Sequence, residues 1–192
     1  MGYVRTTDAA TEPIPLTEAK THLRVDHSDD DTYITSMIKA ARQLAEEYTQ
    51  RSFITQTWKY FANEFPCEIK LLHGRAISVT SIKYSVTTAL DTTMSATLYT
   101  AAFNQDVGKI RAPNNGWPDT NTDFYESIEV IYTAGYGASA SNVPEGVKAG
   151  IKILLSDMYE NRQSWATRQV YTIGLGGRPL YQIMLDNYKI YE

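Results

Sequence analysis

The stretch DDDTYITSMIKAARQLAEEY, residues 29–48, decides how the first third of the chain folds. Its apolar residues recur at intervals of three and four, which places them on one face of an α-helix. Ser28 is predicted to cap this helix. The three carboxylates after it also favour a helix start, because negative charge suits the N-terminal end of the helix dipole. We predict one long amphipathic helix over residues 29–50, with Ile38 and Leu44 facing a later helix. The apolar face consists of Ile34, Met37, Ile38, Ala41, Leu44, Ala45 and Tyr48.

A shorter helix is predicted just before this segment. The stretch PLTEAKTHLR, residues 15–24, contains Thr17, whose hydroxyl can accept a hydrogen bond from a free amide of the first helical turn. Glu18 then lies in that first turn, where a carboxylate is favourable. We therefore expect Thr17 to cap a short helix that ends before residues 25–27.

Helical periodicity returns after Pro144, a residue that suits the first turn of a helix. Apolar residues recur on one face over residues 144–162, and a last apolar set within residues 180–188 indicates a short terminal helix. Gly146 and Gly150 lie about one turn apart in the first of these segments. Because glycine has no side chain, this pair leaves room for another helix to approach closely.

Between the helical portions the sequence is rich in β-branched and aromatic residues. Five or six short strands of this kind predict a small antiparallel sheet, arranged as a sandwich or a partial barrel. The strand-like runs cover residues 53–61, 68–72, 77–84, 97–99 and 127–132, with a turn at His73-Gly74.

The predicted fold class is therefore α+β. Neither helical portion can bury its apolar stripe alone, so the two must pack together. We predict a helical bundle core of two N-terminal and two C-terminal helices, with a small antiparallel β domain inserted between them. The helical core is expected to comprise residues 1–52 plus 141–192, and the inserted β domain residues 53–140.

Composition narrows the classes of function. The chain has 192 residues, 22 acidic and 18 basic side chains, and a single cysteine, Cys67. One cysteine excludes a disulfide framework within the chain and is typical of a reducing compartment. Net charges are −3 over residues 1–52, −2 over 53–140 and +1 over 141–192. No segment concentrates Lys and Arg as a sequence-specific nucleic-acid binder does, and no apolar run approaches the ~20 residues of a membrane span.

Sequence motifs of catalysis are missing. The chain has no Gly-x-Ser-x-Gly elbow, no His-Glu-x-x-His pair and no Walker-type phosphate loop. His22 and His27 flank Asp29–Asp31, which suggests a hard-metal site, but adjacent acids at a helix start point in several directions. We interpret that run as a solvated helix start. We predict no enzyme, no metal and no cofactor, with a hydrolase that uses Cys67 or a histidine as a minor alternative.

Tyrosine is the most unusual feature of the composition, with 14 residues. A tyrosine offers a large contact area and keeps a polar tip, which suits protein interfaces. The end of the chain concentrates such side chains around the glycine-rich stretch 174–177, which we interpret as a hinge rather than an anion cradle. The candidate interface residues there are Trp165, Tyr171, Arg178, Tyr181, Tyr188 and Tyr191.

Several motifs, taken in order, resemble the head–tail connector (adaptor) proteins of tailed bacteriophages and phage-like gene transfer agents. They are spread over residues 15–162, most of the chain. The motifs are PLTEAKTHLRVD (15–26), DDD (29–31) with AAR (40–42), YTQR (48–51), TQTW (55–58), VIYTAGYG (130–137), VPE (143–145) and YENR (159–162).

The resemblance implies a structural virion protein whose helical core carries a β domain inserted after the long helix. It also implies a homo-oligomeric ring, of twelve copies, with the portal protein above it and a stopper or tail-completion protein below. The ring extends the DNA channel, and DNA passes through the lumen without specific binding, which a mildly acidic surface favours. No membrane contact is implied. The expected location is the neck of the virion, after synthesis in the cytoplasm of a host bacterium.

For the contact with the portal we predict an arm formed by residues 163–192, which carries all six candidate residues. Deleting residues 179–192 is then expected to leave a folded protein that no longer joins the portal. Two alternatives stay open. The terminal helix can instead pack on its own subunit, with Tyr181 and Tyr188 completing the core. The chain can also be a monomeric β module that binds a small ligand or glycan on platforms formed by the tyrosines and by Trp58, Trp117 and Trp165.

Overall fold

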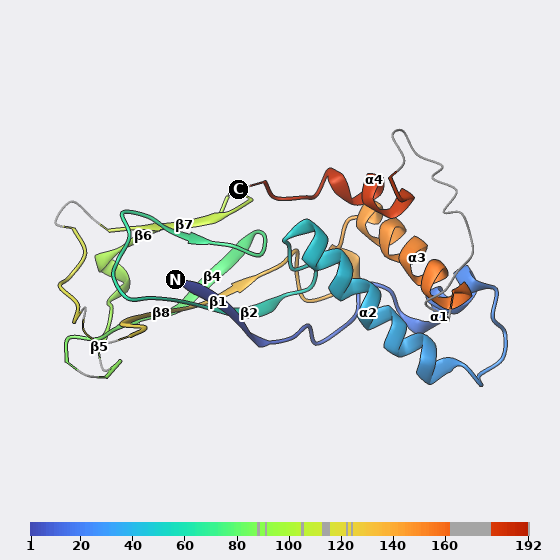
Figure 1. Ribbon diagram of the computed structural model, residues 1–192, viewed down its shortest axis with the longest axis horizontal. Helices are drawn as coiled ribbons and strands as arrows, with labels where there is room; N and C mark the ends of the chain where they lie inside the picture. Colours follow the sequence, from blue (N-terminus) through green and yellow to red (C-terminus); the bar gives the residue numbers. More distant parts are fainter. Residues whose placement is uncertain are drawn as a thin grey trace. The chain divides into compact units, whose positions relative to one another are not determined.

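A computed structural model of the chain describes residues 1–87, 89–90, 92–104, 106–112, 116–121, 123, 125–161 and 178–191. Within these ranges it contains four α-helices and eight β-strands, and all the strand pairs are antiparallel (Figure 1). The predicted α+β class is confirmed. The chain divides into two compact units, one of Met1–Ala10 with Thr55–Tyr136 and one of Thr11–Ile54 with Gly137–Glu192.

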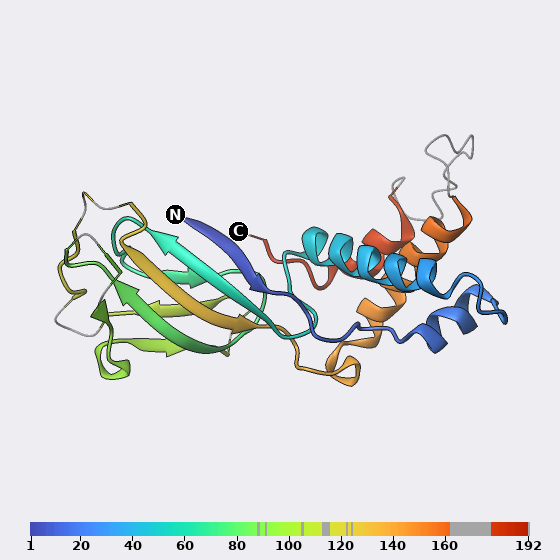
Figure 2. The same ribbon diagram turned by 90° about the horizontal axis from the view of Figure 1, so that it is seen from below.

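The first unit, here called the β unit, consists of two antiparallel sheets (Figure 2). The larger sheet has the order β1 (Gly2–Thr7), β2 (Gln56–Ala62), β8 (Ile128–Ala134), β4 (Ala76–Tyr84) and β5 (Thr92–Thr93). The smaller sheet has the order β3 (Ile69–Leu71), β7 (Gly108–Arg111) and β6 (Thr100–Ala102).

One hydrophobic core lies between the two sheets, because both contribute to the same cluster of buried side chains. Strand β8 is central in the larger sheet and alternates strictly between buried and half-buried residues, as a strand with one face on the core does. Its inward face consists of Ile128, Val130, Tyr132 and Ala134, all fully buried. From the smaller sheet Ile69, Leu71 and Ile110 complete the core.

The β unit departs from the predicted boundaries at the N-terminus. Residues 1–10 were assigned to the helical core, yet they belong to the β unit, where β1 pairs with β2 from Gly2↔Phe61 to Thr7↔Thr57. The strand is held by Tyr3, whose hydroxyl donates a hydrogen bond of 2.7 Å to the Lys70 carbonyl. Four of its six residues are exposed, so it lacks the apolar alternation by which a strand is recognised in a sequence.

A second departure concerns the middle of the chain. The strand predicted over residues 97–99 is wrong, because residues 96–98 form a short 3-10 helix and the strand β6 starts at Thr100. Strand β7 was not predicted. The turn at His73-Gly74 is confirmed by positive φ angles of 68° and 102°, but it joins β3 and β4, which belong to different sheets.

The second unit, here called the helical unit, contains α1 (Leu16–Leu23), α2 (Asp31–Thr49), α3 (Glu145–Glu160) and α4 (Leu180–Asp186) (Figure 1). Helix α3 packs against the other three helices, and α2 also contacts α1 and α4. The predicted capping was wrong at two starts. Pro15 and Asp30 occupy the N-cap positions, without a side-chain hydrogen bond, in place of Thr17 and Ser28.

The buried face of α2 is rotated relative to the predicted stripe. Leu44 is 46% exposed, so the expectation that it faces α3 is wrong. Arg42 takes an inward position instead and is fully buried, with ion pairs of 2.8 Å to Glu12 and 2.7 Å to Glu46. Glu46 also accepts a hydrogen bond of 2.9 Å from the Phe53 amide. A buried charge is stable only when it is paired, and these contacts satisfy that condition.

Candidate functional site

The C-terminal segment from Arg178 to Tyr191 contains four of the six residues predicted for a partner interface. The other two, Trp165 and Tyr171, lie outside the described residues, as does the glycine-rich stretch 174–177. In this segment Arg178 precedes α4, Tyr181 lies on it, and Tyr188 and Tyr191 follow it. The described part of the predicted site therefore lies in one short segment of the helical unit.

Arg178 is held at the start of α4 by a compact polar cluster. Its guanidinium forms an ion pair of 2.8 Å with Asp186 and donates a hydrogen bond of 2.9 Å to the Tyr48 hydroxyl of α2. That hydroxyl in turn donates a bond of 2.5 Å to Asp186. The Tyr181 ring contacts the Tyr48 ring edge-to-face, at 6.3 Å between centroids. The cluster thus links the two ends of α4 to helix α2.

The charges of this cluster support each other. Burial raises the pKa of Tyr48, and the hydrogen bond to Asp186 raises it further, so the hydroxyl stays protonated and remains a donor. The hydrogen bond from Tyr48 lowers the pKa of Asp186, with a further contribution from Arg178. The hydrogen bond to Asp186 in turn raises the pKa of Arg178. The carboxylate is therefore ionised at neutral pH, and the segment keeps its fixed position on α2.

Helix α4 also packs closely on α3, at the two glycines that the sequence singled out. A Cβ atom added at Gly150 would lie 3.0 Å from Leu185, and one added at Gly146 would lie 2.7 Å from the Tyr188 hydroxyl. Leu185 is fully buried. The predicted close approach of another helix at this glycine pair is thus confirmed, and α4 is the approaching helix.

The end of the chain is tied to the turn that follows α2. The Ile190 amide donates a hydrogen bond of 3.0 Å to the Thr49 carbonyl, and the Arg51 guanidinium donates one to the Tyr188 carbonyl. Lys189 places its ammonium 4.6 Å from the centre of the Tyr48 ring, a favourable cation–π distance. Deleting residues 179–192 would remove these contacts together with the buried Leu185, so the expectation that the remainder folds normally is not supported.

Part of the segment nevertheless faces solvent. Leu180 and Met184 lie one turn apart on α4 and are 41% and 39% exposed, and Tyr191 is 75% exposed. Tyr181 and Tyr188 instead contact their own unit, as the alternative of a packed terminal helix describes. Sequence reasoning missed the exposed pair because a seven-residue helix shows too little periodicity to separate its two faces. We call Leu180, Met184 and Tyr191 the exposed C-terminal surface.

The other sequence candidates are engaged within their own unit. The Trp58 ring stacks on His73 at 3.6 Å between centroids, and the Trp117 ring stacks on Phe65 at 4.5 Å. The Trp117 indole also donates a bond of 2.7 Å to the Pro66 carbonyl. These faces are covered, which disfavours their use as glycan platforms. Trp165, the third predicted platform, lies outside the residues the structure describes.

No centre for metal or thiol chemistry emerges from the described ranges. No group of three or more His, Cys, Asp or Glu side chains that could hold a metal ion is found among them. His27 lies 4.0 Å from Asp29, and Cys67 is exposed. Within the same ranges no helix combines the length and the apolar character that a bilayer crossing requires.

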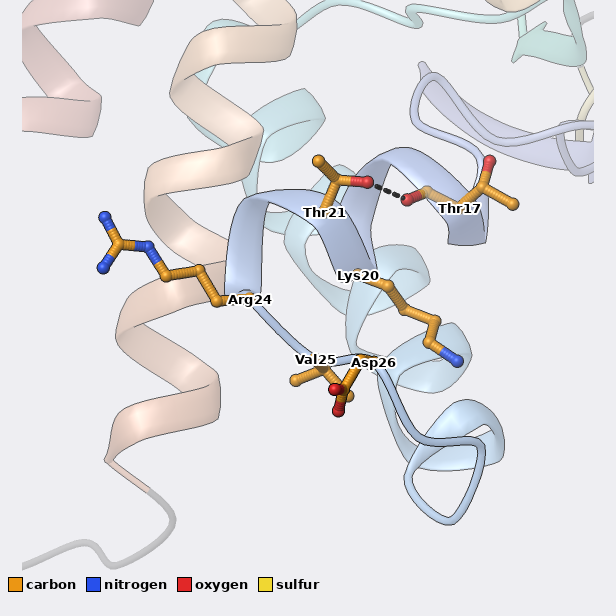
Figure 3. A pocket seen from close by; sticks show the side chains of 6 residues that line it. All are labelled: Thr17, Lys20, Thr21, Arg24, Val25 and Asp26. Atoms are coloured by element: carbon orange, nitrogen blue, oxygen red, sulfur yellow. Dashed lines mark hydrogen bonds between the residues drawn. The ribbon is translucent and has the colours of Figure 1, made fainter.

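A hollow of about 500 Å³ lies at the end of α1. Figure 3 shows the side chains that line it. Arg24 and Lys20 point to opposite sides of the helix, and Lys20 forms an ion pair of 2.6 Å with Asp31. The Thr21 hydroxyl donates to the Thr17 carbonyl at 2.9 Å. Because its polar groups are satisfied locally or diverge, this hollow is not organised for a ligand. Its lining consists of Thr17, Lys20, Thr21, Arg24, Val25 and Asp26.

Comparisons with known proteins agree with the resemblance found in the sequence. Residues 13–92 match the model of the phage gp6-like head-tail connector protein family. This region includes α1, α2 and strands β2, β3 and β4. The resemblance to head–tail connectors is thus confirmed. No curated protein matches the chain.

Solved structures extend the similarity to the whole fold. A chain in the neck of an empty GTA particle, computed with C6 symmetry, is similar with a TM-score of 0.83 at 19% identity, over 100% of this chain and 97% of that chain. A chain in the virion of a native gene transfer agent particle gives 0.82 at 19% identity with the same coverage. A chain in the neck of a native GTA particle, computed with C12 symmetry, gives 0.80 at 18% identity and again the same coverage.

Proposed function

We propose that this chain is a head–tail connector, a structural protein in the neck of a virion or a phage-like particle. The observation that carries the proposal is that a head-tail connector family model matches residues 13–92 while the whole fold is similar to chains of GTA necks. The family is one of structural proteins, and the role requires a stable scaffold rather than a catalytic centre. In this proposal the helical unit is a bundle. The helical unit and the β unit each have a core that can supply such a scaffold.

The functional form is a ring, with twelve copies as the proposed number. Similar chains occur in particle necks computed with C6 and C12 symmetry, which supports a cyclic assembly. A ring requires heterologous contacts, in which two different surfaces of each subunit meet. The ring is placed between the portal protein and a stopper or tail-completion protein, and it extends the DNA channel.

The exposed C-terminal surface is the proposed contact with the portal. Leu180, Met184 and Tyr191 are apolar or aromatic side chains in water, of the kind that interfaces use as anchors. The segment that carries them is fixed on α2 by Arg178 and Asp186, so these side chains are already in place before the partner binds. Such preorganisation lowers the entropic cost of association.

Native mass spectrometry with the matching portal tests the function as a whole. We expect a portal complex that carries a full ring of this chain, with twelve copies. A chain that stays monomeric in the presence of its portal and never enters a complex would contradict the proposal.

A triple substitution tests the contact surface. Leu180→Ser, Met184→Ser and Tyr191→Ser together should weaken portal binding by at least about tenfold, because hot-spot side chains contribute about 2 kcal/mol or more each. The matched control replaces three exposed apolar side chains of the β unit, Val86, Leu98 and Tyr125, by serine. Equal portal binding by a folded triple variant and by wild type would move the contact away from α4.

A further inference from the structure

The outward face of the smaller sheet of the β unit carries three cations. Along β3, Ile69 and Leu71 are buried and Lys70 between them is exposed. Along β7, Gly108 and Ile110 are buried, whereas Lys109 and Arg111 point away from the core, with Arg111 69% exposed. We call Lys70, Lys109 and Arg111 the cationic face. The charges come together only because β3 pairs with β7.

Lys70 and Lys109 lie directly opposite each other in the strand register. Like charges in such a cross-strand pair destabilise a sheet. A single carboxylate compensates for them in part: Glu68 is 3.1 Å from Lys109 and 2.5 Å from Arg111, and these hydrogen bonds lower its pKa. Within the described part of the chain, Lys70 has no ion-pair partner. Among the described residues three cations therefore share one anion, so the face keeps a net charge of about two positive units in a chain whose net charge is −4.

The composition of this face differs from that of a protein interface. The remaining outward positions on β6 are Thr100 and Ala102, which are exposed and small. Protein interfaces are built around buried aromatic or aliphatic anchors, and lysine is depleted in them. Lysine and arginine without such anchors are typical of surfaces that contact phosphates.

We propose that the cationic face contacts the phosphate backbone of duplex DNA that passes through the ring. This inference rests on the proposed function, which makes DNA the polyanion that moves past each subunit. Lys109 and Arg111 are two residues apart, about 7 Å along the strand, and Lys70 is about 5 Å away across it. DNA carries a phosphate on each strand about every 3.4 Å of its axis, so the face spans about two or three phosphates.

Contacts of this kind do not depend on the DNA sequence and hold the duplex only weakly. Lys70 and Arg111 are exposed and Lys109 is partly exposed, and Glu68 remains as a competing anion for Lys109 and Arg111. Each phosphate contact can therefore exchange for the intramolecular ion pair. DNA is kept centred and can still slide, which refines the expectation that it passes without specific binding.

The test measures binding of the full chain to a fluorescent 30-base-pair duplex by anisotropy, together with amide chemical shifts in an NMR titration with the same duplex. Three phosphate contacts predict a slope of about −2.7 in log K against log salt, which is about a 40-fold loss of affinity from 50 to 200 mM salt. The largest shifts are expected at Lys70, Lys109 and Arg111. Lys83, on the larger sheet, should show no shift.

Variants of the cationic face and of Glu68 should change the affinity for DNA in opposite directions. Replacing the three cations together (Lys70→Gln, Lys109→Gln and Arg111→Gln) should lower affinity at 50 mM salt at least tenfold and bring the slope below about 1 in magnitude. Glu68→Gln should strengthen binding severalfold, because it frees Lys109 and Arg111. The matched control replaces Arg24, Lys39 and Lys83 by glutamine and so changes the net charge by the same amount. Its loss of affinity should agree within about threefold with the loss expected from net charge alone.

Equal losses in the cationic-face variant and in the control would overturn the proposal. So would tighter binding of poly-glutamate than of DNA at equal charge, which would make this face a contact for an acidic protein. Portal-ring formation is scored separately by native mass spectrometry. A ring that forms without DNA contact refutes only this inference, whereas a chain that binds DNA but never joins a portal refutes the proposed function.

Discussion

Replacing Leu185 by alanine tests how the C-terminal segment is held. Leu185 is the fully buried residue of α4, and its side chain lies against Gly150 of α3. Removing a buried leucine side chain costs about 2–5 kcal/mol, through lost transfer free energy and through the cavity that remains. In a protein of this size that corresponds to a fall in Tm of about 4–20 °C. Leu180→Ala, on the exposed side of the same helix, should cost less than about 1 kcal/mol.

Urea unfolding followed by far-UV circular dichroism gives the free energy of unfolding for both variants. Hydrogen exchange of the Ile190 amide adds a local measurement, because this amide is bonded to the Thr49 carbonyl only while the segment is docked. In Leu185→Ala this amide should exchange at least tenfold faster. Equal effects of the two alanine substitutions, in unfolding and in exchange, would refute the packing of α4 on α3.

Three further predictions concern the two cores. Arg42→Ala should lower the free energy of unfolding by about 3–5 kcal/mol in urea titrations, because it leaves Glu46 buried without its partner; a loss below 1 kcal/mol would contradict the buried ion pair. Burial lowers the pKa of His73 to about 4 from 6.5, so the unfolded chain takes up the proton first and stability should fall as the pH drops from about 6.5 to about 4. Asparagine tolerates the positive φ of this turn, so His73→Asn should fold and lose that part of the pH dependence. An unchanged pH profile of stability in this variant would contradict the role of His73. Gly108→Ala places a Cβ atom 2.6 Å from that of Ala76 and should cost about 1–3 kcal/mol in thermal unfolding, whereas an unchanged Tm would show that the sheets can separate there.

Elements with a long apolar period or a strongly β-forming composition could be predicted from the sequence. Helix α2 was found because its apolar period continues over 19 residues, and β8 because residues 127–132 are rich in β-branched and aromatic side chains. The limit of this reasoning is visible within α2. Periodicity alone cannot distinguish Leu44 from a core residue, and it cannot anticipate that the charged Arg42 is buried, because the compensating Glu12 lies 30 residues away.

The candidate site was predictable only in its local parts. Gly146 and Gly150 indicated a close helix contact, because two residues four apart lie on the same face of one helix. Which residues of the C-terminal segment face solvent depends on the packing of α4, so the exposed positions of Leu180 and Met184 could not be predicted from the sequence. The cationic face could not be predicted from the sequence for a similar reason: Lys70 and Lys109 become neighbours only through the pairing of β3 with β7.

The place of β1 in the larger sheet has a consequence for synthesis on the ribosome. Gly2–Thr7 is made before β2, with which it pairs about 50 residues later, and β2 is completed on its other edge only by β8, which starts at Ile128. At about 5–20 residues per second, the first strand waits roughly 6–25 s for the sheet to close. During that interval the nascent chain exposes unpaired strand edges, which can pair with strands of other chains. Translation through residues 60–128 is thus the period in which a chaperone, or a neighbouring copy on the same polysome, meets the open sheet.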